Sequence, residues 1–265
     1  MMEWLHRARR RLAKIARYGL GPEARARKQA DQAKRRNAGF FESDRWQHDK
    51  AVSRRRYSSY GEYVEHQSGK LEEVLPRLRE TEDDDFAEFR RRFGSCPQLR
   101  AVRTVLCLGA RLGTEVKALH ALGYFAVGID LNPGEGNRCV LPGDFHDVVF
   151  PDGSVDAVYC NALDHAFDLD KVMAEVRRLL RPGGLFVLDL LQGYDEERGF
   201  VPGEYEAIMW RDHEEFIKRV GDLGGFVLET VRPLGYIRRD HWTQAVFRKP
   251  ASATAAARAL AAAEA

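Results

Sequence analysis

Residues 105–115 are VLCLGARLGTE, an apolar run followed by two glycines and the first residues of a helix. The run Val105–Leu108 is typical of a strand that is buried on both faces. Gly109 lets the chain bend where this strand ends, and Gly113 leaves backbone open to a ligand. The segment therefore predicts a strand, a turn and a helix, with the turn at the edge of a sheet where α/β folds bind their ligands.

Short apolar runs continue to alternate with amphipathic stretches as far as residue 248. Strands are expected at 102–108, 125–130, 138–141, 155–160, 184–190, 226–234 and 243–248, and helices at about 114–122, 169–180 and 211–223. Strands joined by helices form a parallel sheet that is covered on both faces. Only a loop separates the last two strands, so we expect these two to be antiparallel.

The part of the chain before this alternation has a different composition. Residues 1–60 hold 17 Lys and Arg against 6 Asp and Glu, although the net charge of the whole chain is only +2. A basic amphipathic helix is expected at 3–18, and two helices between 64 and 93, the second with Thr81 as its N-cap. We divide the chain into a basic, partly helical N-terminal arm at 1–56, a helical lid or layer at 57–94, an α/β domain at 95–249 and a disordered Ala-rich tail at 250–265.

The overall composition is that of an ordinary globular chain. Hydrophobic residues make up 44% of the 265 positions, which suffices for a sizeable core. No apolar run approaches the roughly 20 residues that span a bilayer, and the N-terminus lacks the apolar stretch of a secretory signal. The four cysteines form no CxxC pair, which argues against a zinc ribbon and suits a reducing cytoplasm. A cytoplasmic location is therefore expected.

Three further motifs accompany the glycine turn. They are DFHD at 144–147 after the third strand, PDGSVD at 151–156 before the fourth, and LLRPGG at 179–184 before the fifth. In this order and spacing the motifs resemble the class I S-adenosylmethionine-dependent methyltransferases, from about Val102 to Leu191. The resemblance implies a Rossmann-like, mostly parallel sheet of seven strands with helices on both faces, and S-adenosylmethionine as the cofactor.

The resemblance also implies a cofactor site. Gly109 and Gly113 match the first and last glycines of the family's cofactor loop, and Asp130 matches the acidic residue that binds the ribose. Asp144 and Phe145 match the positions that hold the amino group and the face of the adenine. The residues expected to bind the cofactor are Gly109, Ala110, Gly113, Glu115, Asp130, Leu131, Asp144, Phe145 and Asn161.

Two positions depart from the family's pattern. Cys107 stands where an acidic residue is usual, and Arg111 replaces the middle glycine. Glu115 can recover polarity toward the amino group of the cofactor, or it only complements the helix dipole. A non-catalytic binding or scaffold protein with a degenerate fold is therefore the alternative to an enzyme. A dinucleotide is disfavoured, because Arg111 and Leu112 crowd the place where GxGxxG would cradle a pyrophosphate.

The sequence says less about the methyl acceptor than about the cofactor. We expect a small molecule or a glycan-like compound, methylated on oxygen, with His165 as the general base just beyond the fourth strand. A packing or capping role for His165 stays open, and His146 is a weaker candidate. Residues 210–213 are expected near the mouth of the site, and residues 57–67 either cover the cofactor as a lid or only pack against the sheet. No metal site is expected, since no cluster has ligand spacing.

The basic arm has three interpretations. An anionic membrane surface is the first, because an apolar stripe runs along the basic helix at 3–18 and each Lys or Arg near such a surface contributes about 1 kcal/mol. Docking on the acidic body of this chain or of a partner is the second. RNA ranks last, because no RNA-binding module accompanies the arm, so nucleic acid is an unlikely partner. The protein is thus expected to be peripheral to the inner membrane surface.

Overall fold

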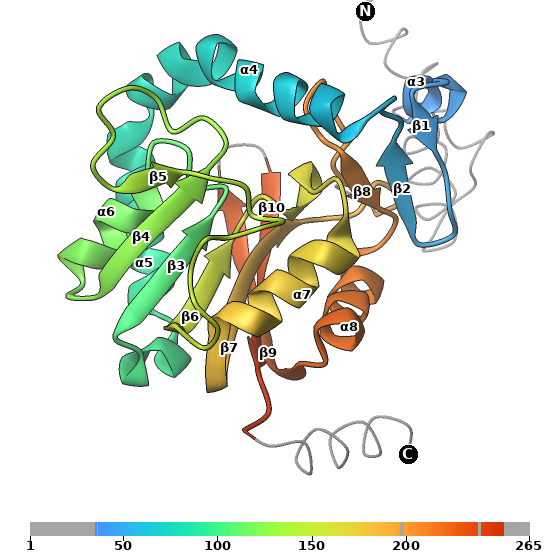
Figure 1. The fold of residues 1–265 in the computed structure, drawn as a ribbon. Coiled ribbons are helices and arrows are strands. Elements are labelled where there is room, and N and C mark those ends of the chain that lie inside the picture. Colours follow the sequence, from blue (N-terminus) through green and yellow to red (C-terminus); the bar gives the residue numbers. More distant parts are fainter. Residues whose placement is uncertain (1–34, 36, 197–198, 238–239, 252–265) are drawn as a thin grey trace, which may run out of the picture.

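The computed structural model describes residues 35, 37–196, 199–237 and 240–251, and its elements are labelled in Figure 1. The basic helix expected at 3–18 and the tail beyond residue 251 lie outside the described residues. Within the described residues, no helix combines the length and the apolar character that crossing a membrane requires.

A seven-stranded sheet with the order β5-β4-β3-β6-β7-β10-β9 forms the centre of the molecule. Its elements and their connecting helices are β3 (Thr104–Leu108), α6 (Thr114–Ala121), β4 (Phe125–Asp130), β5 (Val140–Pro142), β6 (Val155–Cys160), α7 (Leu169–Leu179), β7 (Leu180–Leu191), α8 (His213–Gly224), β9 (Val227–Ile237) and β10 (Asp240–Arg248). Strands β3 to β7 are parallel, and β10 is antiparallel to both β7 and β9. The Rossmann-like sheet and its antiparallel last pair are therefore confirmed.

Both faces of the sheet are buried, as the apolar run at 105–108 predicts. Leu106 and Leu108 belong to a core shared with α7 and α8, whereas Val105 and Cys107 belong to a core shared with α6 and with α5 (Glu82–Gly94). Successive side chains of a strand point to opposite faces, so a run without polar residues supplies both cores. Cys107, one of the two departures from the family's pattern, is thus a packing residue with a fully buried thiol.

Two helices precede the sheet in the chain. Helix α4 (Tyr60–Glu80) begins at Ser59, whose side chain accepts a hydrogen bond from the backbone N–H of Glu62, and α5 follows at once. Thr81 stands between them at the predicted N-cap position. Its hydroxyl donates to the carbonyl of Arg77 instead of capping the backbone of α5.

A second, small sheet was not expected from the sequence. It joins β1 (Trp46–Gln47) and β2 (Val52–Arg55), which follow α3 (Ala38–Glu42), to β8 (Ile208–Trp210). Strands of two to four residues have no detectable period, and the pairing of β2 with β8 spans more than 150 positions. The end of the predicted arm is thereby attached to the α/β domain.

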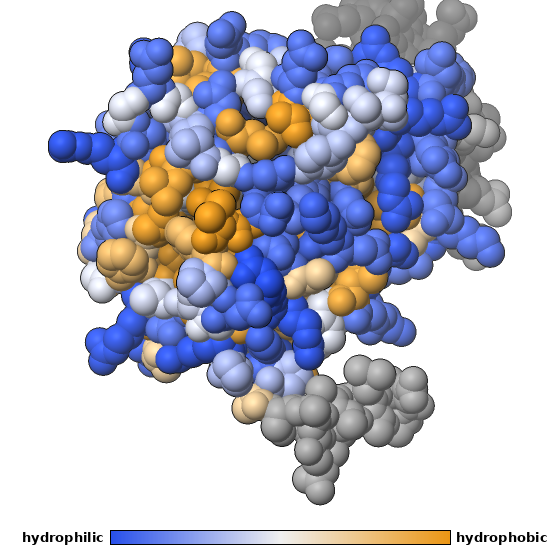
Figure 2. Space-filling view, in the orientation of Figure 1, coloured by the Kyte–Doolittle hydropathy of each residue, from blue (hydrophilic) through white to orange (hydrophobic). Residues whose placement is uncertain are grey.

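The connection between β5 and β6 contains no helix among the described residues. Residues 143–154 cross this end of the sheet as a loop, and Leu141 and Val149 are exposed there. Figure 2 shows apolar residues gathered at the surface over this part of the sheet. On the face of the sheet that packs against α7 and α8, no further helix covers β4 and β5 among the described residues.

Candidate cofactor and acceptor site

Helix α4 crosses the carboxyl ends of the parallel strands, as Figure 1 shows. The hydroxyl of Tyr63 donates to the carbonyl of His165 at 3.0 Å, and the side-chain amide of Asn132 donates to the carbonyl of Ser68 at 2.7 Å. Because α4 is bonded to the loops after β4 and β6, it forms one wall of the space above the sheet edge. The expected lid at 57–67 thus lies over the loops that the motifs predict to bind the cofactor.

Two adjoining cavities lie in this space. The first, of about 40 Å³, is lined by Tyr63, Gln67, Lys70, Leu71, Gly109, Arg111, Asp130, Leu131, Asn132, Phe145, Ala162 and His165. The second, of about 350 Å³, includes Ala110, Glu115, Asn161, Asp164, Glu206 and Trp242 in its lining. Five residues line both: Lys70, Gly109, Arg111, Ala162 and His165. These five mark the junction between the two cavities.

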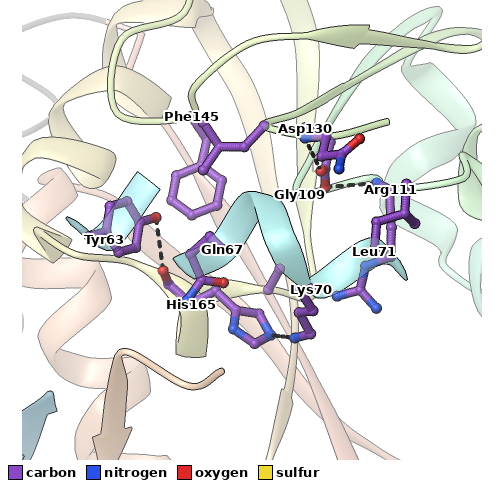
Figure 3. Close-up of a pocket in the computed structure, with 12 residues that line it drawn as sticks. Tyr63, Gln67, Lys70, Leu71, Gly109, Arg111, Asp130, Phe145 and His165 are labelled. Carbon is purple, nitrogen blue, oxygen red and sulfur yellow. Dashed lines mark hydrogen bonds between the residues drawn. The ribbon is translucent and has the colours of Figure 1, made fainter. Parts of the chain in front are cut away.

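Asp130 ends β4 at the wall of the first cavity (Figure 3). Its two carboxylate oxygens accept from the backbone N–H groups of Arg111 and Asn132, each at 2.9 Å. Burial raises the pKa of Asp130, and these two hydrogen bonds oppose the increase. Each oxygen retains a further acceptor direction, so the carboxylate is able to receive the hydroxyls of a ribose.

The two glycines of the loop have different roles. Gly109 has a φ of 70° and lines both cavities, and a Cβ there would lie 2.7 Å from the Cβ of Ala162. Gly113 has a φ of 75° and lines neither cavity, and a Cβ there would lie 2.8 Å from a methyl group of Val140. The expectation that Gly113 leaves backbone open to a ligand is therefore wrong, because β5 fills that space.

Of the two residues expected to bind the adenine, only one lines a cavity. Phe145 lines the first cavity, but Asp144 lines neither. The carboxylate of Asp144 instead accepts from the hydroxyl of Tyr60 and from the backbone and ring of His146. Burial acts to raise the pKa of Asp144, but these hydrogen bonds lower it further than burial raises it. In this conformation the hydroxyl of Tyr60 occupies Asp144, the residue that the resemblance assigns to the amino group of the adenine.

His146 is excluded as a base by its contacts. It is fully buried, its Nδ1 lies 2.7 Å from the carboxylate of Asp144, and its Nε2 accepts from the backbone N–H groups of Phe167 and Asp168. Both ring nitrogens are thus occupied. His146 is a structural residue that connects the loop after β5 to the start of α7.

His165 lies at the junction of the cavities, but its hydrogen bonds argue against the predicted role of base. Its Nδ1 donates to the carbonyl of Tyr205 at 2.9 Å, so its Nε2 accepts from the Nζ of Lys70 at 2.7 Å. Burial lowers the pKa of His165 to about 3, with a further contribution from the charge of Lys70. The ring is neutral but too weakly basic to remove a proton from a hydroxyl.

Lys70 is the titratable group that the sequence analysis missed. Burial, assisted by the charge of Arg111, lowers the pKa of Lys70 to about 8. The ammonium also lies 5.3 Å from the centre of the Tyr205 ring. A signal was present in the sequence, because Tyr60, Tyr63 and Lys70 follow one another at helical spacing on a segment already expected to be a lid.

Glu115 and Asn161 line the second cavity, as the resemblance implies. Glu115 is buried in the first turn of α6, and burial raises its pKa to about 8. The structure also brings Asp164, His165 and Glu206 together, with ligand atoms within 4.8 Å of one another. Residue 206 is distant in the sequence, so no spacing could reveal this cluster. The ammonium of Lys70 already lies against its histidine, which makes the cluster a poor cation site.

Residues 210–213 were expected near the mouth of the site, and of these only Trp210 lies beside it, in a small cavity that shares Asn161, Asp164, Leu191 and Trp242 with the second one. Trp210 is buried in β8 and its indole N–H donates to the carbonyl of Leu191 at 2.9 Å. His213 contacts the carboxylate of Glu196 at 2.6 Å. None of these residues lines either cavity. Residues 208–210 form β8 of the small sheet, which holds this segment beside the site and not at its mouth.

Comparisons with known proteins match the central part of the chain to methyltransferases. A family model described as a methyltransferase domain matches residues 106–188. The chain is 53% identical over 47 residues to a sterol 24-C-methyltransferase of Gibberella zeae, which covers 17% of this chain and 12% of that protein. It is 34% identical over 128 residues to an uncharacterized methyltransferase of Mycobacterium bovis, which covers 45% of this chain and 52% of that protein. The chain thus matches only a part of each relative.

Two solved structures share the fold. A methyltransferase of Haloferax volcanii, solved with the Trm112 methyltransferase activator, superposes with a TM-score of 0.59 at 20% identity over 69% of this chain and 97% of that one. The 1,6-didemethyltoxoflavin-N1-methyltransferase of Burkholderia thailandensis, solved with S-adenosylhomocysteine, has a TM-score of 0.57 at 15% identity over 77% of this chain and 99% of that one. Residues 106–188 thus match the methyltransferase domain family, and the chain has the fold of the S-adenosylmethionine-dependent methyltransferases.

Proposed function

We propose that this protein transfers a methyl group from S-adenosylmethionine to an oxygen of a small-molecule or glycan-like acceptor. The observation that carries the proposal is the junction of the two cavities. The first cavity holds the ribose and adenine candidates Asp130 and Phe145, the second is large enough for an acceptor, and Lys70 and His165 lie where the two meet.

The residues present fit the cofactor. Asp130 offers acceptors to a diol, Phe145 offers an apolar face, and Glu115 offers a carboxyl group to an ammonium. The first cavity, at about 40 Å³, is smaller than the roughly 300 Å³ at which ligand pockets begin. Binding therefore requires the α4 side chains Tyr63, Gln67 and Leu71 to move aside, which makes α4 a lid. When bound, the cofactor supplies an electrophilic methyl group on a sulfonium.

The residues of this chain position the acceptor hydroxyl and provide a base that removes its proton. Holding an acceptor hydroxyl in line with the methyl group supplies roughly 7–11 kcal/mol of the barrier. We assign the removal of the hydroxyl proton to Lys70 and not to His165, because a base works best with a pKa close to the working pH. His165 acts as a positioning residue, since its Nε2 holds the Nζ of Lys70 at the junction.

Calorimetric titration with S-adenosylhomocysteine tests the proposal first. Binding in the micromolar range supports it, whereas a protein that does not bind the compound is the non-catalytic scaffold of the alternative. Incubation with cofactor labelled in the methyl group then tests transfer. A product methylated on carbon, as the names of the sterol relatives would suggest, contradicts the O-methylation part alone.

Tyr60→Phe is expected to tighten binding of S-adenosylhomocysteine by about 3–10-fold. The change removes the hydroxyl that occupies Asp144, a hydrogen bond with a net contribution of about 0.5–1.5 kcal/mol to the closed lid. Tyr57→Phe is the matched control, because the Tyr57 hydroxyl contacts His66 at 3.0 Å and not Asp144. Equal affinities of the two variants in calorimetry would show that the hydrogen bond between Tyr60 and Asp144 does not hold the lid closed.

The basic arm is proposed to contact an anionic membrane. This proposal is supported by the excess of Lys and Arg in residues 1–60. Deletion of residues 1–36 is expected to abolish co-sedimentation with vesicles that contain phosphatidylserine, because each basic residue near the surface contributes about 1 kcal/mol. Vesicles of phosphatidylcholine alone serve as the control. Co-sedimentation that survives the deletion removes the arm from any membrane role.

A further inference from the structure

Arg111 occupies a backbone conformation that its residue type disfavours. Among the described residues it is the one non-glycine residue with a positive φ, at 47°. Its backbone N–H donates to Asp130 at 2.9 Å and its carbonyl accepts from the side chain of Asn137 at 3.2 Å. Glycine is the residue that adopts such a conformation without strain, and the family has glycine here. A strained arginine in this turn therefore calls for a functional reason.

The side chain of Arg111 supplies that reason. It lines both cavities, and Figure 3 shows it between Leu71 and Lys70. Within the described part of the chain, its guanidinium has no hydrogen bond or ion pair with a carboxylate. Its charge contributes to the pKa values of the surrounding groups, which are Lys70, Glu115, Asp130, Asp164 and His165. A guanidinium placed among these groups without a carboxylate partner is a site for an anion.

The charges around the cavity restrict which anion fits. Glu115 and Asp164 line the same second cavity as Arg111, so a ligand there meets carboxyl oxygen acceptors beside the guanidinium. A simple anion such as phosphate offers these acceptors no cationic donor, whereas a zwitterion places its carboxylate at Arg111 and its ammonium at Glu115. The α-amino acid end of a nucleoside thioether is a ligand of this kind.

The position of the loop restricts it further. The backbone of Arg111 is bonded directly to the carboxylate of Asp130, the candidate ribose acceptor. Its guanidinium therefore lies within one side-chain length of the ribose site and extends toward the second cavity. A nucleoside whose ribose were bound at Asp130 would therefore have its amino-acid end within reach of this guanidinium.

We infer that Arg111 binds the α-carboxylate of the methionine part of S-adenosylmethionine, with Glu115 facing its ammonium. This inference rests on the proposed function and names a specificity determinant within that site. At this position the family has glycine, which offers the cofactor only its backbone, whereas Arg111 offers the α-carboxylate a charged side chain.

The test compares two ligands in calorimetry. S-adenosylhomocysteine carries the carboxylate, whereas S-adenosyl-3-thiopropylamine has the same adenosine, sulfur and amine without it. The wild-type protein is expected to bind the first about 10–100-fold more tightly, the range of a charge-assisted hydrogen bond. In Arg111→Gly this ratio is expected to fall close to one. Arg111→Met, which keeps the bulk of the side chain at the cavity wall, is expected to lose the ratio in the same way.

Arg79→Gln is the matched control, because Arg79 lies exposed on α4 and lines neither cavity. It is expected to retain the wild-type ratio. A wild-type ratio in both Arg111 variants overturns the inference and leaves the proposed function standing. A wild-type protein that binds neither ligand overturns the proposed function and the inference together. Arg111→Gly relieves the positive φ, so an unfolded variant is not expected, and thermal melting checks this.

Discussion

Replacing Lys70 by methionine is expected to lower the turnover number by about 10²–10⁴-fold, the contribution of a well-placed general base. Lys70 is the basic group at the junction of the cavities whose pKa, at about 8, lies near a physiological working pH. Methionine keeps the length of the side chain and its apolar stem, so the lid should still close. The affinity for S-adenosylhomocysteine is therefore expected to change little.

The pH profile separates a base from a residue that only packs. The pKa of Lys70 is lowered, so its free amine forms as the pH rises through about 8, and wild-type turnover should increase over that range. In Lys70→Met this increase is expected to vanish, and Lys70→Arg should not restore it, because a guanidinium remains protonated. Lys117→Met is the control, since Lys117 pairs with Glu82 away from both cavities. A Lys70→Met enzyme with the wild-type profile removes Lys70 from the mechanism.

Replacing Arg92 by methionine is expected to lower the free energy of unfolding by about 3–5 kcal/mol. Its guanidinium lies 2.8 Å from the carboxylate of Asp189, and the two side chains are 4% and 0% exposed. Tyr159 and Gln244 donate to the same carboxylate at 2.9 and 2.7 Å. These neutral donors remain in the variant, but the buried negative charge then has no cation beside it, and that is the source of the cost.

Urea unfolding followed by circular dichroism measures this loss. Arg90→Met on the same helix is the control, because Arg90 is exposed and its replacement should change stability by less than about 0.5 kcal/mol. Arg92→Met combined with Asp189→Leu should recover part of the loss, because both buried charges are then absent. A loss below about 1 kcal/mol in Arg92→Met would show that water or a rearranged side chain compensates Asp189.

The fold of the α/β domain was predictable because its signals are local. Every expected strand from residue 102 to 248 is present, and the run at 105–108 supplies both cores through the alternation of its side chains. The loop 109–113 and Asp130 were also placed correctly at one edge of the sheet. This success follows from parallel topology, which brings the carboxyl ends of neighbouring strands together wherever they lie in the sequence.

The chemistry of the site was less predictable because it depends on burial and on distant partners. His165 was expected to be a base, yet the contact with Lys70, 95 positions away, leaves it without a free nitrogen. Gly113 was assigned to a ligand, yet Val140 fills the space beside it. Neither contact has a sequence signature, since a hydrogen bond between two elements depends on how they pack.

By itself, the sequence predicted the methyltransferase fold, the order of strands and helices along the chain, and the edge of the sheet at which the cofactor is expected. Periodicity, glycines and short motifs carry that information within a few residues. Only the tertiary structure decided that α4 covers this edge, that Tyr60 occupies Asp144 and that Lys70 has a pKa near neutrality. Desolvation and charge coupling arise when distant segments exclude water together, so these properties exist only in the folded chain.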